Sequence, residues 1–461
     1  MGFRLDEQGG TRLVQQVASE TAFTPGWQVI AAVVVFLVVY AVIITEKMSR
    51  AAVALTGAVI AALLGVVGLE EAYSVHVSWR MLFLLVGMML LSGMASRSGV
   101  VQFAAMKAVQ RVKGCPLKML VILTVGTAVG SALLDNVTTV LLIVPLTFLV
   151  TRVLKVSPMP YLTAEIIAVN VGGAATMVGS LPNMMIGGAN PHLTFSDFLV
   201  HAGLVSLLIL ILTVSLLAWL YRKQLSAGNA ERKELLAIDA AGAIQDRRLA
   251  LKTVIVLGLT VIGLVLHGPL SAWTGVRIEA ATVAMAGATL LMLAGLKGKA
   301  VDEALDNVEW RTVVFFAGLF AVVGGLVETG VVGRLATMAL QLASGDIGYF
   351  SILVLWLSGM VSATVDNTPF VAAMIPLVQE FGAQMNLTDP EALNPVWWSL
   401  ALGSSLGGSG TLIGAAANVV VAGMAAREGK ELSYLDYLKI GAPVALLSLA
   451  VSTGYICLFL L

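Results

Sequence analysis

Two stretches of this sequence share Ser-Ala and Asp-Asn at the same positions, SALLDNVTT at residues 131–139 and SATVDNTPF at residues 362–370. Each lies in the middle of an apolar run that is too long for one membrane crossing, at 117–154 and 348–378. An ionisable residue at that depth in a bilayer is costly and normally marks an ion or proton pathway. We therefore predict that each run is a re-entrant helical hairpin with Asp135 or Asp366 at its tip.

The composition around these stretches is that of a membrane protein. Hydrophobic residues make up 58% of the 461 residues and charged residues only 12%, whereas a soluble domain carries about 25% charged residues. The formal net charge is zero, so there is no overall attraction to nucleic acid. With only Cys115 and Cys457, a disulfide framework is excluded. We predict an all-α polytopic membrane protein.

Apolar runs of about 20 residues predict ten transmembrane helices besides the two hairpins. Two of them, at 163–188 and 398–424, are broken by Gly, Ser, Thr and Asn. The uninterrupted runs lie at 27–45, 51–69, 79–95, 198–221, 252–267, 279–296, 311–328 and 440–461. We therefore divide the chain into an external N-terminal segment (1–26), a first repeat of five spans (27–221), a cytoplasmic linker (222–251) and a second repeat of five spans (252–461).

Counting crossings predicts the orientation of the chain. Five spans on each side of the linker place both termini outside the cell and the linker inside. On this path 22 of the 27 Lys and Arg residues lie at the cytoplasmic face, as the positive-inside rule requires. The N-terminal residues lack the pattern of a cleavable signal. We expect a multi-pass protein of the inner (plasma) membrane.

The two halves carry the same polar residues at a fixed offset of 231 positions. Examples are Trp79-Arg80 against Trp310-Arg311, Asp135-Asn136 against Asp366-Asn367, and Pro145 against Pro376. Such residue types are rare at depth in a membrane, so chance similarity is a poor explanation. Because each half has an odd number of crossings, the second half is predicted to be inverted relative to the first. An inverted repeat is typical of secondary transporters.

The broken spans repeat as well, at an offset of 235. Gly173, Thr176, Gly179 and Asn183 match Gly408, Thr411, Gly414 and Asn418. Glycines there can unwind a helix so that hydroxyls and carbonyls face a ligand, or they can serve close helix packing. Similarly, the tip aspartates can carry a proton or cap the second helix of each hairpin.

These residues resemble the ion transporter superfamily, in particular its ArsB/NhaD branch, which includes arsenite permeases, sodium/proton antiporters and the melanosomal P protein. The resemblance runs from about Trp27 to the C-terminus and is carried by the doubled Asp-Asn…Pro and Gly-x-x-Thr-x-x-Gly-x-x-x-Asn patterns. It implies two hairpins and two broken helices around a central site that moves against a static scaffold. Proton coupling is then expected at Asp135 and Asp366, and substrate binding at Asn136, Thr138, Thr176, Ser180, Asn183, Asn367, Thr368, Ser409, Thr411 and Asn418.

The function that the sequence favours is proton-coupled efflux of arsenite and antimonite, which are uncharged trihydroxy species at neutral pH. A sodium (lithium)/proton antiporter of NhaD type is the alternative. A di- or tricarboxylate carrier is less favoured because a tip carboxylate would repel an anion. An enzyme is not expected, since the sequence offers no His/Glu metal site and no nucleophile with its base.

We expect no cofactor and no metal, with the proton as coupling ion and sodium as the alternative. The expected partners are a small inorganic substrate and the lipid bilayer, with a soluble ATPase docking at the linker as a further candidate. Among the remaining polar residues, Glu165 is expected near the cytoplasmic face, with a place in a proton path as the alternative. Arg80 and Arg311 are expected to extend to the membrane interface.

Overall fold

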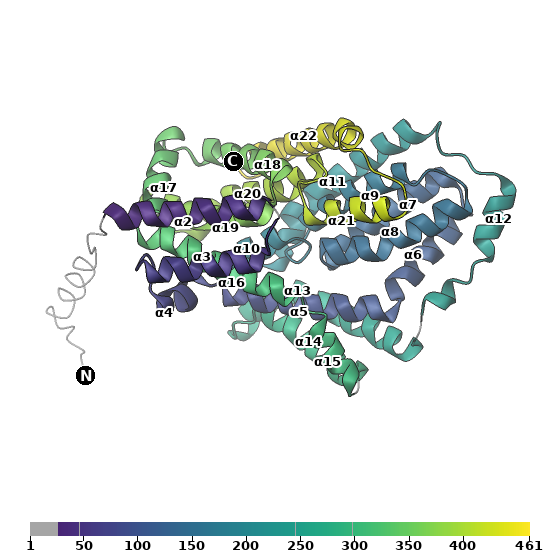
Figure 1. Cartoon of the computed structure of the whole chain (residues 1–461), viewed down its shortest axis with the longest axis horizontal. Helices are drawn as coiled ribbons and strands as arrows, with labels where there is room; N and C mark the ends of the chain where they lie inside the picture. The colour runs from purple at the N-terminus through teal and green to yellow at the C-terminus, as the bar shows by residue number, and fades with distance from the viewer. Residues whose placement is uncertain (1–25, 46, 245, 297) are drawn as a thin grey trace.

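The computed structural model describes residues 26–45, 47–244, 246–296 and 298–461. Within these residues the regular secondary structure is helical, at 82% helix, and nine helices are long and apolar enough to cross a membrane (Figure 1). The predicted all-α polytopic fold is confirmed. The predicted external segment 1–26 falls almost wholly outside the described residues.

The first half contains a helix at each predicted uninterrupted span. Its helices are α2 (Gly26–Thr45), α3 (Arg50–Leu63), α4 (Leu69–Glu71), η1 (Ala72–His76), α5 (Trp79–Ser98), α6 (Val100–Arg111), α7 (Pro116–Leu133), α8 (Asn136–Val153), α9 (Met159–Ala174), α10 (Leu181–Ala189) and α11 (Phe195–Tyr221). Helix α6 lies outside the predicted spans.

The linker and the second half complete the chain. The linker holds α12 (Asn229–Ala237) and η2 (Ala240–Ala243). The second half comprises α13 (Arg247–Thr274), α14 (Ala280–Gly295), α15 (Lys299–Asp306), α16 (Trp310–Glu328), α17 (Val331–Leu342), α18 (Ile347–Thr364), α19 (Asn367–Gln384), η3 (Pro390–Leu393), α20 (Asn394–Gly407), η4 (Gly408–Gly410), α21 (Ala416–Arg427) and α22 (Tyr434–Phe459).

Helices α3 and α14 are shorter than the runs that predicted them. They have 14 and 16 residues, or about 21 and 24 Å of helix, against a hydrocarbon core of about 30 Å. Gly65 ends the first of these runs early, since it follows α3 with a φ of +63°, a left-handed conformation that favours glycine.

Both hairpins are present as two helices joined by a short tip. The four helices α7, α8, α18 and α19 have 18 residues each. Helix α7 ends at Leu133 and α8 begins at Asn136, while α18 ends at Thr364 and α19 begins at Asn367. The chain therefore turns at each Asp-Asn pair, as predicted.

The two halves also repeat their packing contacts. Gly87 of α5 lies against the backbone of Ala284 in α14, and Gly318 of α16 lies against the backbone of Ala54 in α3. A Cβ atom at either glycine would come within 2.9 Å and 2.7 Å of a carbonyl carbon, so both helix pairs need glycine for their close approach. The inverted orientation of the halves across the membrane stays a prediction.

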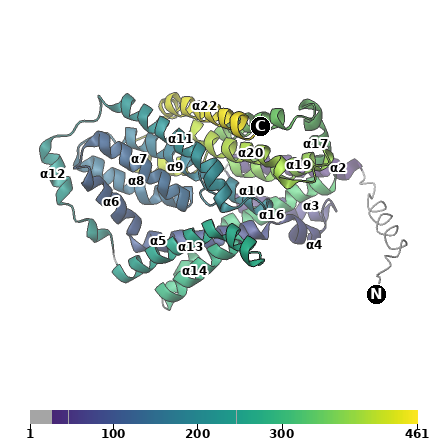
Figure 2. The same cartoon turned by 180° about the vertical axis from the view of Figure 1, so that it is seen from behind.

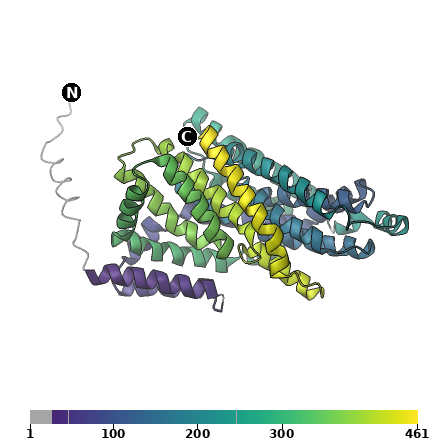
Figure 3. The same cartoon turned by 90° about the horizontal axis from the view of Figure 1, so that it is seen from above.

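The core of the molecule is formed by the broken helices. Every residue of α9 after Met159 is buried, as is every residue of α20 from Pro395 onward. Helices α2, α11 and α13 instead expose large apolar side chains, including Leu37, Leu204 and Leu251 at 57–63%. An outward apolar face of this kind suits contact with lipid. Figure 3 shows α22 crossing diagonally over one side of the molecule.

The linker helix α12 lies at one end of the molecule, beside α6, α7 and α8 (Figure 2). An ion pair connects this helix to the first half, since the ammonium of Lys155 lies 3.4 Å from the carboxylate of Glu231 in α12. Arg152 pairs with Glu428 in the loop after α21, at 2.5 Å. Charged pairs therefore join elements of both halves near the C-terminal end of α8.

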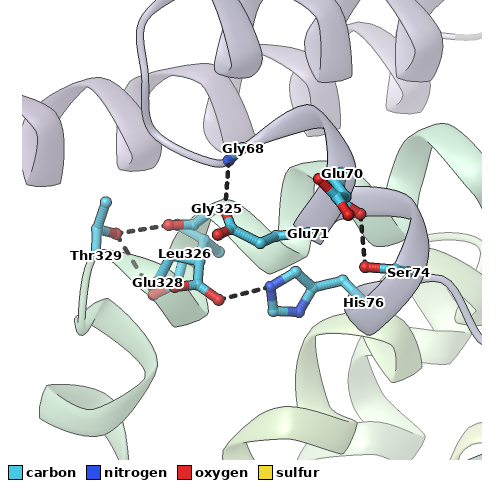
Figure 4. Close-up of polar contacts among 9 residues, drawn as sticks. All are labelled: Gly68, Glu70, Glu71, Ser74, His76, Gly325, Leu326, Glu328 and Thr329. Atoms are coloured by element: carbon cyan, nitrogen blue, oxygen red, sulfur yellow. Dashed lines mark hydrogen bonds and ion pairs between the residues drawn. The ribbon is translucent and has the colours of Figure 1, made fainter. Parts of the chain in front are cut away.

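A second polar cluster joins the loop after α3 to α16 (Figure 4). His76 Nε2 lies 2.9 Å from Glu328 Oε1, and the Thr329 hydroxyl donates to the Gly325 carbonyl at 2.7 Å. Glu328 lies at the C-terminal end of α16, as the sequence indicated. This cluster links the first half to the second.

Candidate functional site

A cavity of about 530 Å³ lies where the two hairpin tips meet the two helix breaks. The loop before α3 and the start of α16 complete its wall through Ser49, Arg50, Glu309, Arg311 and Thr312, together with leucine, methionine and phenylalanine side chains of α5 and α16. Both hairpin tips and parts of both helix breaks therefore line one volume.

The first hairpin tip is held by Asp135. Its Oδ1 accepts a hydrogen bond from the Thr138 backbone amide at 2.8 Å, and its Oδ2 lies 3.3 Å from the Ser92 hydroxyl of α5. Asp135 thus acts as the N-cap of α8. The capping interpretation of the tip is correct in this geometry, and the same side chain also lines the cavity.

The second tip differs in its partner. Asp366 caps α19 by accepting from the Thr368 amide at 3.0 Å, and its other oxygen forms an ion pair with the guanidinium of Arg50. Arg50 begins α3 in the first half, so this ion pair bridges the halves across the cavity. The Arg50 side chain is 34% exposed and that of Asp366 is 17% exposed, so the pair is only partly screened by solvent.

The tip asparagines fasten each hairpin to the neighbouring broken helix. Asn367 Nδ2 donates to the Ser404 carbonyl at 3.1 Å. With its amide oriented to satisfy its neighbours, Asn136 donates to the carbonyls of Val169 at 3.2 Å and Gly179 at 2.8 Å. Val169 and Ser404 are repeat-related positions, so the two tips use the same attachment.

Threonine hydroxyls connect each helix break to the hairpin of the same half. Thr176 donates to the Ala132 carbonyl at 2.6 Å, and Thr411 donates to the Ala363 carbonyl at 2.5 Å. Each bond joins a break to the first helix of the hairpin in the same half. Ser409 donates to the Leu406 carbonyl at 2.6 Å within its own break.

The two asparagines of the broken spans lie at the contact between the halves. Asn183 Nδ2 donates to carbonyls of the first break, at 3.1 Å to Ala174 and 2.9 Å to Thr176. Asn418 Nδ2 donates to Gly408 and Thr411 of the second break at 2.8 and 2.9 Å. Both side chains are fully buried.

Their oxygens complete a reciprocal pair of bonds. Asn418 Oδ1 accepts from Asn170 Nδ2 of the first half at 2.9 Å, and Asn183 Oδ1 accepts from Ser405 of the second half at 3.3 Å. Asn170 and Ser405 are themselves repeat-related. Each half therefore anchors the break of the other.

The structure separates the predicted site residues into two groups. The cavity wall contains Asp135, Asn136, Ser180, Asp366, Asn367 and Thr368. The remaining predicted residues do not line this cavity and instead hold the tips and breaks in place: Thr138, Thr176, Asn183, Ser409, Thr411 and Asn418. Direct binding by this second group stays a prediction.

Sequence reasoning missed several charged residues of the wall. Arg50, Glu309 and Arg311 line the cavity, although Arg311 was expected to extend to the interface. Its repeat equivalent Arg80 pairs with Glu279 at 2.9 Å beside a separate cavity of about 270 Å³. The available signal was that Arg50 and Arg311 each lie at the start of an apolar run.

Glu165 requires a correction. It was expected near a polar face, but its side chain is fully buried in the middle of α9. Its Oε1 accepts from the Thr147 hydroxyl at 2.5 Å. The sequence-based expectation relied on the basic side of the membrane and ignored that α9 is enclosed by other helices.

Four helix N-termini meet at the cavity, those of α8, α10, α19 and α21. The N-terminus of a helix carries a partial positive charge and favours a negative group. Aspartate caps α8 and α19, and Ser180 caps α10 by accepting from the Asn183 amide at 3.4 Å. The N-cap of α21 is Ala415, whose side chain makes no capping bond.

Metal binding finds no support in the described part of the chain, where no three His, Cys, Asp or Glu side chains are grouped to hold an ion. The site is instead built from carboxylates, guanidinium groups, amides, hydroxyls and helix ends. Such a set can hold a small polar or anionic solute by hydrogen bonds and charge.

Comparison with known sequences identifies a family. A family model described as citrate transporter matches residues 40–403. An uncharacterized transporter of Mycobacterium tuberculosis is 40% identical over 433 residues, covering 93% of this chain and 98% of that protein. The P protein of Mus musculus is 31% identical over 506 residues, covering 93% of this chain and 60% of that protein.

Two solved structures share the fold. The YdaH transporter of Alcanivorax borkumensis gives a TM-score of 0.59 at 16% identity, covering 87% of this chain and 88% of that chain. MtrF of Neisseria gonorrhoeae, described with a class of antimetabolite efflux pumps, gives 0.58 at 12% identity, covering 87% and 84%.

None of these matches is specific to the ArsB/NhaD branch that the motifs suggested. The family model and the Mycobacterium tuberculosis relative are described as transporters and not as enzymes, and a membrane transporter agrees with the helical fold. The chain is a multi-pass membrane transporter that belongs to the citrate transporter (CitMHS) family.

Proposed function

We propose that the protein is a secondary transporter that binds a small carboxylate in the central cavity and moves it by alternating access, coupled to protons. The observation that carries this proposal is the convergence of four helix N-termini and two arginines on one cavity. The family description as citrate transporter supports the same class of substrate.

The charges of the cavity support an anion over a cation as the substrate. Its wall holds Arg50 and Arg311 against Asp135, Glu309 and Asp366, a formal charge of about −1. Each helix N-terminus contributes about +0.5 elementary charge, so four of them supply about +2. The balance favours an anion, even before the loss of any carboxylate charge by protonation.

The sequence-based objection to a carboxylate substrate loses force in this geometry. That objection was repulsion by the tip aspartates. Asp366 is paired with Arg50, and each tip aspartate directs one oxygen to the backbone of its own helix. The uncapped start of α21 beside Ala415 offers the most direct place for a substrate carboxylate.

Arsenite efflux and sodium/proton exchange, which the sequence favoured, are competing proposals for the same cavity. None of the relatives named above is described by either substrate. An uncharged arsenite molecule would use the amides and hydroxyls alone, and a sodium ion would use the carboxylates. Docking of an ATPase at α12 likewise stays a prediction, since an ion gradient is sufficient to drive this class of transporter.

By the predicted orientation, the loop before α3 and the start of α16 lie at the cytoplasmic side. The cavity wall includes both, so we infer that the structure represents an inward-facing state. Movement of the hairpins and broken helices relative to α3, α5, α14 and α16 would then expose the cavity to the other side.

The test is transport by the purified protein in liposomes that contain a pH-sensitive dye. Citrate, succinate, arsenite, antimonite, sodium and lithium are added separately, with labelled carboxylates to follow substrate entry. We expect a carboxylate to enter and to change the internal pH, and Arg50→Gln to reduce this at least tenfold. Arg97→Gln is the matched control, because its guanidinium pairs with Glu303 away from the cavity.

The competing substrates give opposite results. Proton movement triggered by arsenite or sodium, with carboxylates inert, would replace this proposal with one of the two sequence-based alternatives. Carboxylate entry without any change in internal pH would keep the substrate and remove the proton as the coupling ion.

A further inference from the structure

A carboxyl group lies enclosed in the transporter at a place separate from the cavity. Glu165 of α9 is fully buried, and only its Oε1 has a partner, the Thr147 hydroxyl of α8 at 2.5 Å. Its Oε2 is buried without any hydrogen-bond partner among the described residues. A buried carboxyl with one unsatisfied oxygen is unusual and calls for an explanation.

No positive charge compensates this carboxyl. Among the described residues, no basic side chain forms an ion pair with Glu165. Tyr161, one turn earlier and near Cys115, directs its hydroxyl to the Pro116 carbonyl at 2.9 Å. The ionisable side chains on the helices packed against α9 are Lys118, Asp135, Arg152, Asp197, His201, Tyr221, Arg427, Tyr434, Asp436, Tyr437, Lys439, Tyr455 and Cys457.

An unpaired carboxylate in such a place is strongly disfavoured, because it loses its hydration and gains no compensating charge. The neutral acid avoids this cost. It also adds an O–H donor, which gives the Oε2 side of the group a hydrogen to share. The surroundings therefore favour a carboxyl that holds a proton until an opening to water lets it leave.

The second half shows that the fold does not need a carboxyl here. The positions equivalent to Thr147 and Glu165 are Val378 and Leu400, and both are fully buried. The same helix pair thus packs well with two apolar side chains. A purely structural role for Glu165 would leave unexplained why one half carries a costly group that the other lacks.

Polar atoms continue from Glu165 toward the hairpin tip. Thr139 of α8 lies two turns closer to the tip than Thr147, about 12 Å along the helix, and packs against Gly130 of α7. The hydroxyls of Thr139 and of Thr127 in α7 are buried without a hydrogen-bond partner in the described structure. The second half has Phe370 in place of Thr139.

We propose that Glu165 is a proton-binding site that couples proton movement to transport, with Thr147 positioning its carboxyl group. This inference rests on the transport function proposed above and names where its proton is carried. Thr139 lies on α8 between Thr147 and the tip residue Asn136 in the cavity wall, so its buried hydroxyl lines the route by which a proton reaches Glu165.

Two transport assays separate proton coupling from substrate movement. Exchange of labelled for unlabelled carboxylate across the liposome needs no net proton transfer, whereas accumulation driven by a pH gradient does. We expect Glu165→Gln to keep exchange within about twofold of wild type and to lose at least nine-tenths of gradient-driven accumulation. Glu428→Gln serves as the matched control, because its carboxylate is exposed and pairs with Arg152 outside the cavity.

Glu165→Leu is a second variant in case Glu165→Gln fails to fold. Leucine is chosen because the second half has Leu400 at the equivalent position. This variant should show the same split between exchange and accumulation. Thr147→Val should shift the pH at which accumulation is half-maximal while exchange remains. A merely structural role would lower exchange and accumulation together in all three variants, and that result would overturn the inference.

Infrared spectroscopy can detect a protonated carboxyl group without any substrate. The wild-type protein at neutral pH should show a carboxylic-acid carbonyl band that loses intensity in Glu165→Gln. An unchanged band, or unchanged gradient-driven accumulation, would overturn the inference while leaving the transport function standing. If the wild type moves no carboxylate in either assay, the proposed function fails, and the infrared band alone then decides whether Glu165 holds a proton.

Discussion

The two halves of the molecule form the same kinds of hydrogen bond at their helix breaks and differ in their ionisable residues. In both, a threonine closes the break, an asparagine fastens the tip and a second asparagine accepts a bond from the other half. The bonds from the threonine and from the tip asparagine satisfy backbone carbonyls, which need partners inside a membrane, and the bonds between the halves join two side chains. Features shared by the halves are therefore best explained by folding.

Several differences between the halves involve ionisable or capping groups. The first half has Thr147 and Glu165 where the second has Val378 and Leu400, and Ser180 where the second has Ala415. The tip aspartates also have different partners, a serine in one half and Arg50 in the other. Since folding needs the same bonds in each half, the asymmetric residues are the better candidates for chemistry.

The largest expected effect comes from a shared feature. Asn183→Ala and Asn418→Ala each remove an amide that holds two or more backbone carbonyls of a break. Leaving such buried carbonyls unpaired costs about 1–3 kcal/mol per group. We expect both variants to lower the thermal unfolding midpoint in detergent by similar amounts and to abolish transport.

The comparison between these two variants is itself the test. A large loss of stability at one asparagine and none at the other would contradict a common scaffold. Normal stability with lost transport would instead place that asparagine among the substrate ligands, as the sequence pattern suggested. Asn229→Ala, at the exposed start of α12 and outside the cavity wall, controls for the loss of an asparagine side chain.

A smaller effect is expected at the tips, where the halves differ in their partners. Arg50→Gln leaves the carboxylate of Asp366 without its ion pair and weakens the positive side of the cavity. We expect transport to fall at least tenfold, or about 1.4 kcal/mol of lost interaction. Ser92→Ala removes only a hydroxyl at 3.3 Å from Asp135 and should change transport by less than about threefold.

A double variant tests whether the loss of transport in Arg50→Gln comes from weaker substrate binding or from the unpaired carboxylate of Asp366. Combining Arg50→Gln with Asp366→Asn removes both charges, which relieves the cost of an unpaired carboxylate. Partial recovery of transport would assign the loss in Arg50→Gln to that carboxylate. Equal losses of transport in Arg50→Gln and Ser92→Ala would show that the partners of the two tip aspartates contribute equally, which contradicts an asymmetry between the halves.

Much of this fold could be predicted from the sequence, because the deciding signals are local. Runs of apolar residues, interrupted by Asp-Asn or by Gly, locate spans, hairpins and breaks, and the offset of 231 exposes the repeat. The cavity was only partly predictable. Arg50 meets Asp366 from 316 positions away, and no spacing rule along one chain predicts such a contact.

Burial was the other quantity that the sequence could not supply. Glu165 lies in a segment whose polarity pattern allows either an outer or an enclosed position. Only the packing of α7, α8 and α20 around α9 decides for the enclosed one. Similarly, Asn183 and Asn418 have the residue type of a ligand, and only the contacts show that their amides are occupied by the backbone.

The smallest expected effect tests the difference between the caps of α10 and α21. In Ala415→Ser, the new hydroxyl can cap α21 as Ser180 caps α10, which should stabilise the protein by about 0.5–1 kcal/mol. If a substrate carboxylate uses the same helix end, the hydroxyl competes with it, and KM should rise about threefold, or about 0.7 kcal/mol. Ala426→Ser, at the other end of α21 and outside the cavity wall, is the control. A gain in stability with an unchanged KM would place the substrate away from α21, and the asymmetry of the caps would then belong to folding, like the features that the halves share.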